Sequence, residues 1–268
     1  MLNINNREYI KCMDNVIDKD RLVREKVHAK VLLRDPEWIW GWGTPAGRVR
    51  AKRRAKLIIE AGNIGPDKIT LEVGCGTGVF TELVSRSGAS ITACDLAEEL
   101  LELARQKSYA SKVTFINGDV SQLGLEHKGQ YDVVWGSSVL HHLDLRLFLP
   151  TALELIKPGG YFVFAEPNML NPRVWLERHS SFIRRLTRTS PDETAFYRWR
   201  LKKLLIDEGF VNVSIRPHEF LHPRIPEPLI PLFQKITSVF EWAWPTREIA
   251  GSLLIRAEKP ANRIEGRQ

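Results

Sequence analysis

The residues with the clearest chemical potential are the glycines that follow an apolar run near position 70. Gly74, Gly76 and Gly78 alternate with other residues directly after the segment ITLEV. Glycine tolerates positive φ and lets a ligand approach the backbone closely, and a helix that begins there offers free N–H groups. This spacing predicts a nucleotide-binding turn, although dinucleotide dehydrogenases and ordinary tight turns share it.

Two further positions separate these alternatives. The dehydrogenase pattern GxGxxG requires glycine at position 79, and this chain has Val79 there. An acidic residue, Glu72, stands ahead of the glycines instead. Acidic groups around the turn suit a ligand that carries positive charge better than they suit a pyrophosphate. The pattern therefore points away from a dinucleotide.

Two aspartates are expected at the ends of the next two strands. Asp95 ends the segment SITACD, where a carboxylate can accept hydrogen bonds from both ribose hydroxyls of a nucleotide. Enzymes that bind NAD share that feature. Asp119 follows in INGDV, and an aspartate there can equally serve as a simple helix N-cap. Both roles of Asp119 stay open at this point.

These residues and two later segments resemble one known family. Residues 72–78, EVGCGTG, resemble motif I of class I S-adenosylmethionine (SAM)-dependent methyltransferases, which is an acidic residue, any residue, and GxGxG. The segment SSVLHHL after the fourth strand resembles a segment frequent in that family, and IKPGG at residues 156–160 resembles the turn into its fifth strand. The resemblance is specific over residues 69–166 and loose elsewhere.

The resemblance implies a SAM site and a methyl-transfer reaction. It implies that Asp95 binds the ribose, that Asp119 accepts from the adenine amino group, and that the fourth strand ends under the methionine part. SAM carries a sulfonium and an ammonium group, which fits an acidic turn. No metal is expected. The expected cofactor contacts are Glu72, Gly74, Cys75, Gly76, Gly78, Asp95, Leu96, Asp119, Val120 and Ser137.

Candidates for a general base follow the fourth and fifth strands. Methyl transfer is an in-line displacement that depends largely on positioning, and a base is needed only for a hydroxyl or a protonated amine. His141 and His142 lie where open α/β sheets bind ligands, and imidazole titrates near neutral pH. The alternative is that one caps a turn and the other packs against the cofactor. Glu166, at the end of the fifth strand, is a further candidate.

Strand and helix patterns alternate regularly through the middle of the chain. Apolar strands that alternate with helices argue for a parallel sheet covered on both faces. With the resemblance, this predicts an α/β fold: a Rossmann-like, seven-stranded, mostly parallel sheet of order 3-2-1-4-5-7-6 with an antiparallel last strand. Residues 1–63 are expected to form an N-terminal helical cap, residues 64–260 the SAM-binding domain and residues 261–268 a tail.

The cap is expected to contain a helix that Pro45 begins and Gly62 closes. Trp40, Trp42 and Arg48 could form a lid over the cofactor, although plain packing of the cap explains them somewhat better. Cap and insertion together would close over the acceptor pocket.

Residues 168–194 break the alternation and are expected to be a substrate-side insertion after the fifth strand. Its arginines suit phosphate or carboxylate groups, and a solvated basic face explains them almost as well. They are Arg173, Arg178, Arg184, Arg185 and Arg188.

Composition narrows the class of protein. Of the 268 residues, 43% are hydrophobic and 26% charged, as in ordinary globular proteins. No run reaches the roughly 18 apolar residues that a membrane-spanning helix needs, and the N-terminal segment lacks the apolar core of a secretory signal. The three cysteines form no CxxC pair. A reduced, cytoplasmic setting is expected.

The net charge of +7 favours anionic partners without naming one. A nucleic-acid methyltransferase loses support because WGSS stands where amino-directed enzymes carry an Asn/Asp-Pro-Pro-aromatic motif. No RNA-binding module is recognisable, so an RNA methyltransferase is the less favoured alternative. A binding protein without catalysis is disfavoured because the glycines and both aspartates are intact.

The acceptor is expected to be a small or lipid-linked metabolite, methylated on oxygen or nitrogen. An alternative places the enzyme at a membrane surface, acting on a lipid or a lipid-linked glycan. Residues 229–244 are expected to form an amphipathic helix that could dock on anionic lipid. Packing of this helix on the core or at a dimer interface is the preferred interpretation.

Overall fold

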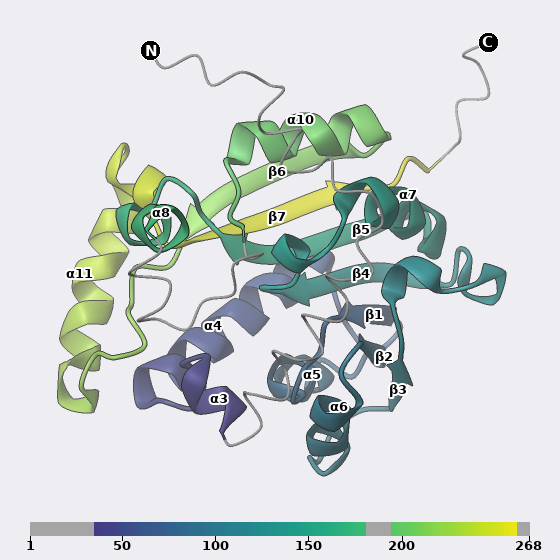
Figure 1. The fold of residues 1–268 in the computed structure, drawn as a ribbon, viewed down its shortest axis with the longest axis horizontal. Helices are drawn as coiled ribbons and strands as arrows, with labels where there is room; N and C mark the ends of the chain where they lie inside the picture. The colour runs from purple at the N-terminus through teal and green to yellow at the C-terminus, as the bar shows by residue number, and fades with distance from the viewer. Residues whose placement is uncertain (1–34, 181–193, 262–268) are drawn as a thin grey trace.

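A single seven-stranded sheet forms the centre of the molecule (Figure 1). The computed structural model describes residues 35–180 and 194–261. The strand order is β3-β2-β1-β4-β5-β7-β6, as predicted. Only β7 runs antiparallel to its neighbours β5 and β6, which confirms the expected topology. The strands are β1 Ile69–Val73, β2 Ser90–Asp95, β3 Val113–Asn117, β4 Tyr131–Ser137, β5 Ile156–Pro167, β6 Val211–His218 and β7 Ser252–Glu258.

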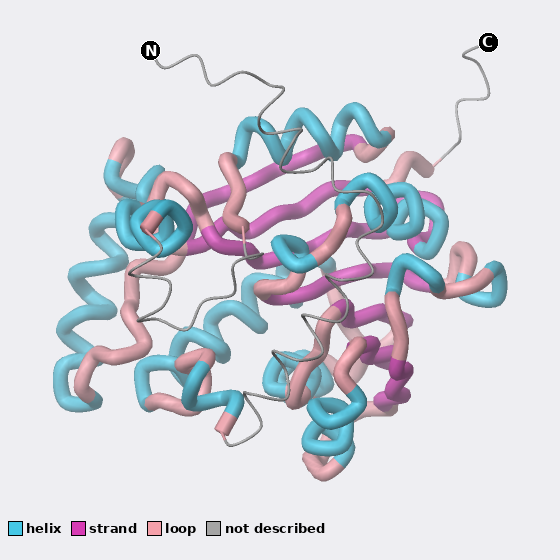
Figure 2. Tube along the Cα trace, in the orientation of Figure 1, coloured by secondary structure: helices cyan, strands magenta, loops and turns pink. Residues whose placement is uncertain are grey.

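Helices cover both faces of this sheet (Figure 2). On one face, α4, α5 and α6 pack in a core with Val133, Trp135 and Val163. On the other, α7 and α10 pack in a second core with Val134 and Phe162. Consecutive strand residues point to opposite faces, and here both faces are buried, which is why the central strands are apolar throughout. The helices are α3 Pro36–Ile39, α4 Pro45–Gly62, α5 Val79–Ser85, α6 Glu98–Arg105, α7 Leu145–Leu155, α8 Pro172–His179, α10 Arg198–Glu208 and α11 Ile230–Trp242.

Helix α4 connects the N-terminal segment to the sheet. Thr44 caps its first turn by accepting a hydrogen bond from the Gly47 N–H at 2.9 Å, and Pro45 is its first residue, as predicted. The predicted C-terminal end at Gly62 is confirmed. Gly62 is the last helical residue, and Asn63 takes the left-handed conformation with φ 48°. Asparagine tolerates this conformation better than most residues, so it can replace glycine here.

Helices α8 and α11 lie together at the left-hand end of the molecule in Figure 1. The predicted amphipathic helix over residues 229–244 exists as α11, preceded by a short 3-10 turn, Glu227–Leu229. Its apolar face packs on the core only in part, where Ile230 and Phe233 contact Ala46 and Leu221. Ile230 and Thr237 are its buried residues, and its exposed apolar side chains include Leu232, Ile236, Val239 and Phe240. Among the described residues, no helix is long and apolar enough to cross a membrane.

Candidate functional site

The glycine turn sits at the carboxyl end of β1, between β2 and β4. Gly74, Gly76 and Gly78 all have positive φ, at 67°, 53° and 78°. The Gly74 and Cys75 N–H groups donate to the Cys94 carbonyl at 2.8 and 3.1 Å, which holds the turn against the end of β2. A Cβ on Gly74 would lie 2.4 Å from Val139 Cγ2. Only glycine therefore fits at the position closest to β4.

Asp95 lies beside this turn, as its predicted role requires. Its Oδ2 accepts from the Gly76 N–H at 2.7 Å and its Oδ1 from the Ala97 N–H at 2.9 Å. Burial raises the pKa of Asp95, while these backbone N–H groups and the charge of His142 lower it. Leu96 follows directly, and its carbonyl accepts from the Asn117 side chain at 3.3 Å. The carboxylate is thus fixed in place at the end of β2.

Asp119 lies at the end of β3 and caps a short 3-10 helix, Val120–Gln122. Its Oδ1 accepts from the Ser121 N–H at 2.9 Å, and its Oδ2 from Gln122 Nε2 at 3.4 Å. The alternative N-cap role is therefore present in the structure. Val120, the next predicted contact, is buried. The Oδ2 bond is long, so this oxygen is the weaker-held of the two.

Glu72 points away from solvent, into the layer between β1 and α5. Its Oε2 accepts from Thr81 Oγ1 at 2.5 Å. Burial raises the pKa of Glu72 to about 8; the Thr81 hydrogen bond opposes this shift and Asp95 adds to it. Cys75 and Cys94 are free and buried, and burial also raises the pKa of both thiols. They are small buried side chains near the turn rather than reactive thiolates.

His141 and Glu166 form a buried hydrogen-bonded pair at the ends of β4 and β5. His141 Nδ1 lies 2.7 Å from Glu166 Oε2, and both side chains are buried. Glu166 Oε1 also accepts from the Val139 and Leu140 N–H groups at 2.8 and 2.9 Å. Glu166 thus lies behind His141 and holds it. The His142 ring packs on that of His141, with centroids 4.2 Å apart.

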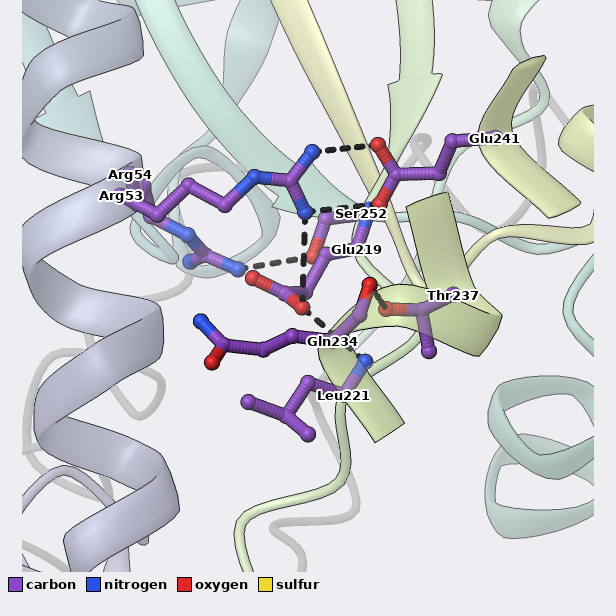
Figure 3. Close-up of polar contacts among 8 residues, drawn as sticks. All are labelled: Arg53, Arg54, Glu219, Leu221, Gln234, Thr237, Glu241 and Ser252. Atoms are coloured by element: carbon purple, nitrogen blue, oxygen red, sulfur yellow. Dashed lines mark hydrogen bonds and ion pairs between the residues drawn. The ribbon is translucent and has the colours of Figure 1, made fainter. Parts of the chain in front are cut away.

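Arg54 is a site residue that sequence reasoning missed. It is buried on α4 and donates to three serine hydroxyls: Ser137 at 3.0 Å, Ser138 at 2.9 Å and Ser252 at 2.7 Å. Its guanidinium also stacks on Trp42, 4.9 Å from the ring centroid. Figure 3 shows the contact with Ser252. Burial lowers the pKa of Arg54 to about 10, with a smaller contribution from Arg50.

The signal for Arg54 was present in the sequence. Ala51, Ala55 and Ile58 form the buried stripe of α4 at helical spacing. Position 54 lies on that same stripe, three residues after Ala51. An arginine within an apolar stripe must find polar partners when it is buried. It is one of several basic residues in RVRAKRRAK, so its residue type alone does not distinguish it.

Of the predicted lid residues, only Trp40 lies at the turn. A Cβ on Gly76 would lie 3.5 Å from the Trp40 ring, which also packs on Ala97 and Leu100. Trp42 packs edge-on against Phe80 in the core between α4 and α5.

Arg48 is exposed and donates to the Gly43 carbonyl. A residue not predicted, Glu37 of α3, accepts from Thr77 Oγ1 at 3.0 Å and from Lys107 Nζ at 2.6 Å. Helix α3 is thereby tied to the glycine turn.

The predicted insertion after β5 is described only in part. Its first half contains α8, which carries Arg173 and Arg178. Arg184, Arg185 and Arg188 lie outside the described residues. The buried Asn168 donates to the carbonyls of Glu248 and Ala250 at 2.9 and 2.7 Å, which ties the end of β5 to the segment before β7. Across residues 35–180 and 194–261, no group of His, Cys, Asp or Glu side chains is arranged to hold a metal.

Known proteins share this sequence pattern and fold. Residues 71–164 match a methyltransferase-domain family. A ubiquinone biosynthesis O-methyltransferase of Cronobacter sakazakii is 33% identical over 135 residues, which are 49% of this chain and 55% of that protein. The Escherichia coli O157:H7 protein of the same name matches to the same extent. The chain thus spans about half the length of the curated relatives it matches.

Solved structures agree on the fold. A SAM-dependent methyltransferase from Archaeoglobus fulgidus superposes with a TM-score of 0.59 at 19% identity, covering 84% of this chain and all of that one. A Haemonchus contortus phosphoethanolamine N-methyltransferase superposes with a TM-score of 0.61 at 17% identity, covering 92% of this chain and 61% of that one. Residues 71–164 thus match a methyltransferase domain, and the chain shares the fold of solved SAM-dependent methyltransferases.

Proposed function

We propose that the protein transfers a methyl group from SAM to an oxygen or nitrogen of a small or lipid-linked metabolite. The observation that carries this proposal is the glycine turn held against Asp95 by the 2.7 Å bond from the Gly76 N–H. It lies within the residues that match the methyltransferase family. The two relatives described above are O-methyltransferases, which favours oxygen as the acceptor atom.

The charges buried around the turn fit SAM. The carboxylate of Asp95 lies on one side, and the cation Arg54 lies at the end of β4 on the other. SAM has an ammonium and a sulfonium centre and one carboxylate, so both signs of charge have a counterpart. The missing side chain at Gly74 lets Val139 pack directly against the turn. The residues present therefore suit the cofactor.

Each group has a distinct role in the proposed site. Asp95 accepts from ribose hydroxyls, and Asp119 accepts from the adenine amino group through its weaker-held Oδ2. Arg54 binds the carboxylate of the methionine part, because it is a buried cation whose hydrogen-bond partners in the described part of the chain are hydroxyl groups. Gly74, Gly76 and Gly78 keep the backbone open to the ligand. Bound SAM supplies an electrophilic methyl group on a sulfonium.

The His141–Glu166 pair supplies a base for a hydroxyl acceptor. A carboxylate accepts from Nδ1–H, which fixes the tautomer and places the imidazole lone pair on Nε2. That nitrogen then takes the proton that the acceptor loses as its oxygen is methylated. Glu166 stabilises the resulting imidazolium without leaving its two backbone donors. Glu166 is thus a positioning residue, and His141 is the base.

Calorimetry with SAM tests the cofactor part of the proposal. We expect binding of SAM and of its product S-adenosylhomocysteine, and none of NAD. Incubating the protein with methyl-labelled SAM and a metabolite extract then reports the acceptor through the labelled product. Absence of SAM binding by the folded chain would refute the proposal.

A second candidate is the same reaction at a membrane surface, on a lipid or lipid-linked glycan. The observation that favours it is the exposed apolar face of α11, together with two tryptophans just at its end. Trp242 is 86% exposed and Trp244 is 75% exposed. Tryptophan suits a membrane interface because its ring is apolar and its N–H group is polar. Flotation with liposomes that contain or lack anionic lipid tests this candidate, and a protein that stays with the soluble fraction in both excludes it.

A further inference from the structure

A dense group of charged side chains lies where α4 passes the end of β6. Arg53 of α4 donates to both carboxylate oxygens of Glu241 on α11, one of them at 2.7 Å (Figure 3). Glu241 also accepts from the backbone N–H of Glu219 at 3.0 Å. Two of the charges in this group, Arg53 and Glu241, therefore satisfy each other and serve the structure.

Arg50, one turn before Arg54 on α4, is different. Its guanidinium stacks on Trp42, 5.0 Å from the ring centroid, and its Nε is buried without a hydrogen bond in the described part of the chain. No ion pair to Arg50 is present among residues 35–180 and 194–261. Burial and the charge of Arg173 lower its pKa, and Glu219 raises it. Arg50 is thus a planar cation, held by stacking, that lacks an anion.

Two polar side chains at the end of β6 face the same group. His218 is 6% exposed, and neither ring nitrogen has a hydrogen-bond partner among the described residues. Burial and the charges of Arg54, Arg53 and Arg50 lower the pKa of His218 well below its usual value, so the ring is neutral at pH 7 and offers one donor and one acceptor.

Glu219 beside it has a buried Oε2 that no described residue contacts through a hydrogen bond. Its Oε1 accepts from the Leu221 N–H at 3.0 Å. Its φ of 79° is rare for a residue with a side chain. Backbone strain of this kind clusters at functional sites, and buried polar atoms are normally satisfied. Glu219 Oε1 also lies 3.8 Å from Arg53 Nη1, so the buried atoms left without a hydrogen bond among the described residues are Arg50 Nε, both His218 ring nitrogens and Glu219 Oε2. These neighbouring atoms indicate a ligand that completes them.

The group is continuous with the proposed reaction centre. His218 pairs with Ser252 in the β6–β7 register, and Ser252 pairs with Pro167 at the end of β5. Arg54 donates to Ser252 with one guanidinium nitrogen, and with another to Ser137 and Ser138 at the end of β4. Glu166, next to Pro167, ends the same strand β5. The unpartnered groups therefore lie on the β5–β7–β6 side of the centre, away from the glycine turn.

We propose that Arg50, His218 and Glu219 form the subsite for the acceptor, which carries an oxyanion, phosphate or carboxylate, beside a hydroxyl group. This inference rests on the proposed methyl transfer. Arg50 binds the oxyanion, because its planar guanidinium is fixed on Trp42 and has no acidic partner. The Glu219 carboxylate accepts the proton of the neighbouring hydroxyl in a hydrogen bond, and the neutral His218 ring donates its N–H to the hydroxyl oxygen. Arg173 on α8 adds positive charge at this side.

The test uses the full chain saturated with S-adenosylhomocysteine, and calorimetric titration with two small probes. Glycerol 3-phosphate carries a phosphate beside hydroxyls, and glycerate carries a carboxylate beside hydroxyls, so the pair distinguishes the two oxyanions. We expect one of them to bind in the millimolar range. Arg50→Gln should weaken that binding at least about tenfold. His218→Phe should also weaken the binding of that probe. When inorganic phosphate replaces the probe, His218→Phe should bind it as the wild type does.

The matched control is Arg48→Gln, which removes an exposed arginine two residues earlier on the same helix. It should leave probe binding unchanged, and all three variants should keep the wild-type affinity for S-adenosylhomocysteine. Binding of neither probe by the wild type, an equal loss in Arg48→Gln, or a loss of S-adenosylhomocysteine affinity in Arg50→Gln would each overturn the subsite. Failure of the wild type to bind S-adenosylhomocysteine would instead refute the proposed function itself.

Discussion

His141 Nδ1 lies 2.7 Å from Glu166 Oε2, and the other oxygen of Glu166 is held by two backbone N–H groups. This arrangement makes Glu166→Gln informative. The amide oxygen can keep both backbone donors, which turns the amide NH2 toward Nδ1 and moves the imidazole proton to Nε2. His141 could then no longer accept a proton from a hydroxyl.

We therefore expect Glu166→Gln and His141→Asn to lower kcat by about 10²-fold or more, the usual contribution of a general base. The KM for SAM should change little, because neither side chain belongs to the proposed cofactor contacts. Glu154→Gln, an exposed glutamate on α7, is the matched control. Unchanged kcat in Glu166→Gln, with the melting temperature preserved, would contradict the role of the pair.

Arg54 gives a prediction about cofactor affinity. Replacing it with Met keeps most of the volume and removes the charge, so the affinity for SAM should fall about 10- to 100-fold, as expected for roughly 1.5–3 kcal/mol from a charged hydrogen bond. Methylthioadenosine lacks the amino-acid carboxylate and should bind the variant as it binds the wild type. Equal weakening of both ligands in calorimetry would show that Arg54 acts through the fold instead.

Glu72 gives a prediction about pH. Its pKa in the folded protein is about 8, above its ordinary value, because burial disfavours the charge. Between pH 5 and 8 the folded state therefore holds a proton that the unfolded state has lost, so this group makes stability fall as pH rises. The fall is on the order of 1 kcal/mol per pH unit at most.

Glu72→Gln removes this titration and can keep the Thr81 hydrogen bond. In urea unfolding without ligand, the variant should match the wild type near pH 5 and exceed its stability near pH 8. A stability difference that does not change with pH would mean that Glu72 stays charged in the folded protein.

Gly74 and Gly76 should differ in their tolerance of a side chain. Alanine at either position must adopt positive φ, which destabilises by about 1 kcal/mol. At Gly74 the new Cβ would also meet Val139 at 2.4 Å, whereas at Gly76 the nearest atoms, in the Trp40 ring, are 3.5 Å away. Gly74→Ala should therefore lower the melting temperature and the SAM affinity more than Gly76→Ala does. Val139→Ala added to Gly74→Ala should restore part of the loss, and its failure to do so would contradict the clash.

The sequence was informative where local pattern decides the structure. The apolar strands and the glycines fixed the sheet and the turn, because strand burial and positive φ depend on residue type. Both ends of α4 follow from residue type, with Pro45 first and Gly62 last, and Asn63 after it takes the left-handed conformation. The strand order itself came from the family resemblance rather than from the pattern.

Long-range pairings could not be predicted in this way. Nothing in the spacing of Arg54 and Ser252 indicates that residues 198 positions apart share a hydrogen bond. The apolar face of α11 was expected to be covered because an amphipathic pattern is the same whether the apolar side meets a core or remains open. Asp119 caps the 3-10 helix Val120–Gln122, and residue type alone could not separate this role from ligand binding.

Arg54 lies between the proposed cofactor site and the proposed acceptor subsite. One guanidinium nitrogen donates to Ser137 and Ser138 at the end of β4, and another donates to Ser252 of β7. If cofactor binding draws this charge toward β4, the field at the β7 side must change as well. Thermodynamic linkage then requires the acceptor to alter SAM affinity by the same factor that SAM alters acceptor affinity. One side chain would thus couple the two ligands, so that the affinity for each depends on whether the other is bound.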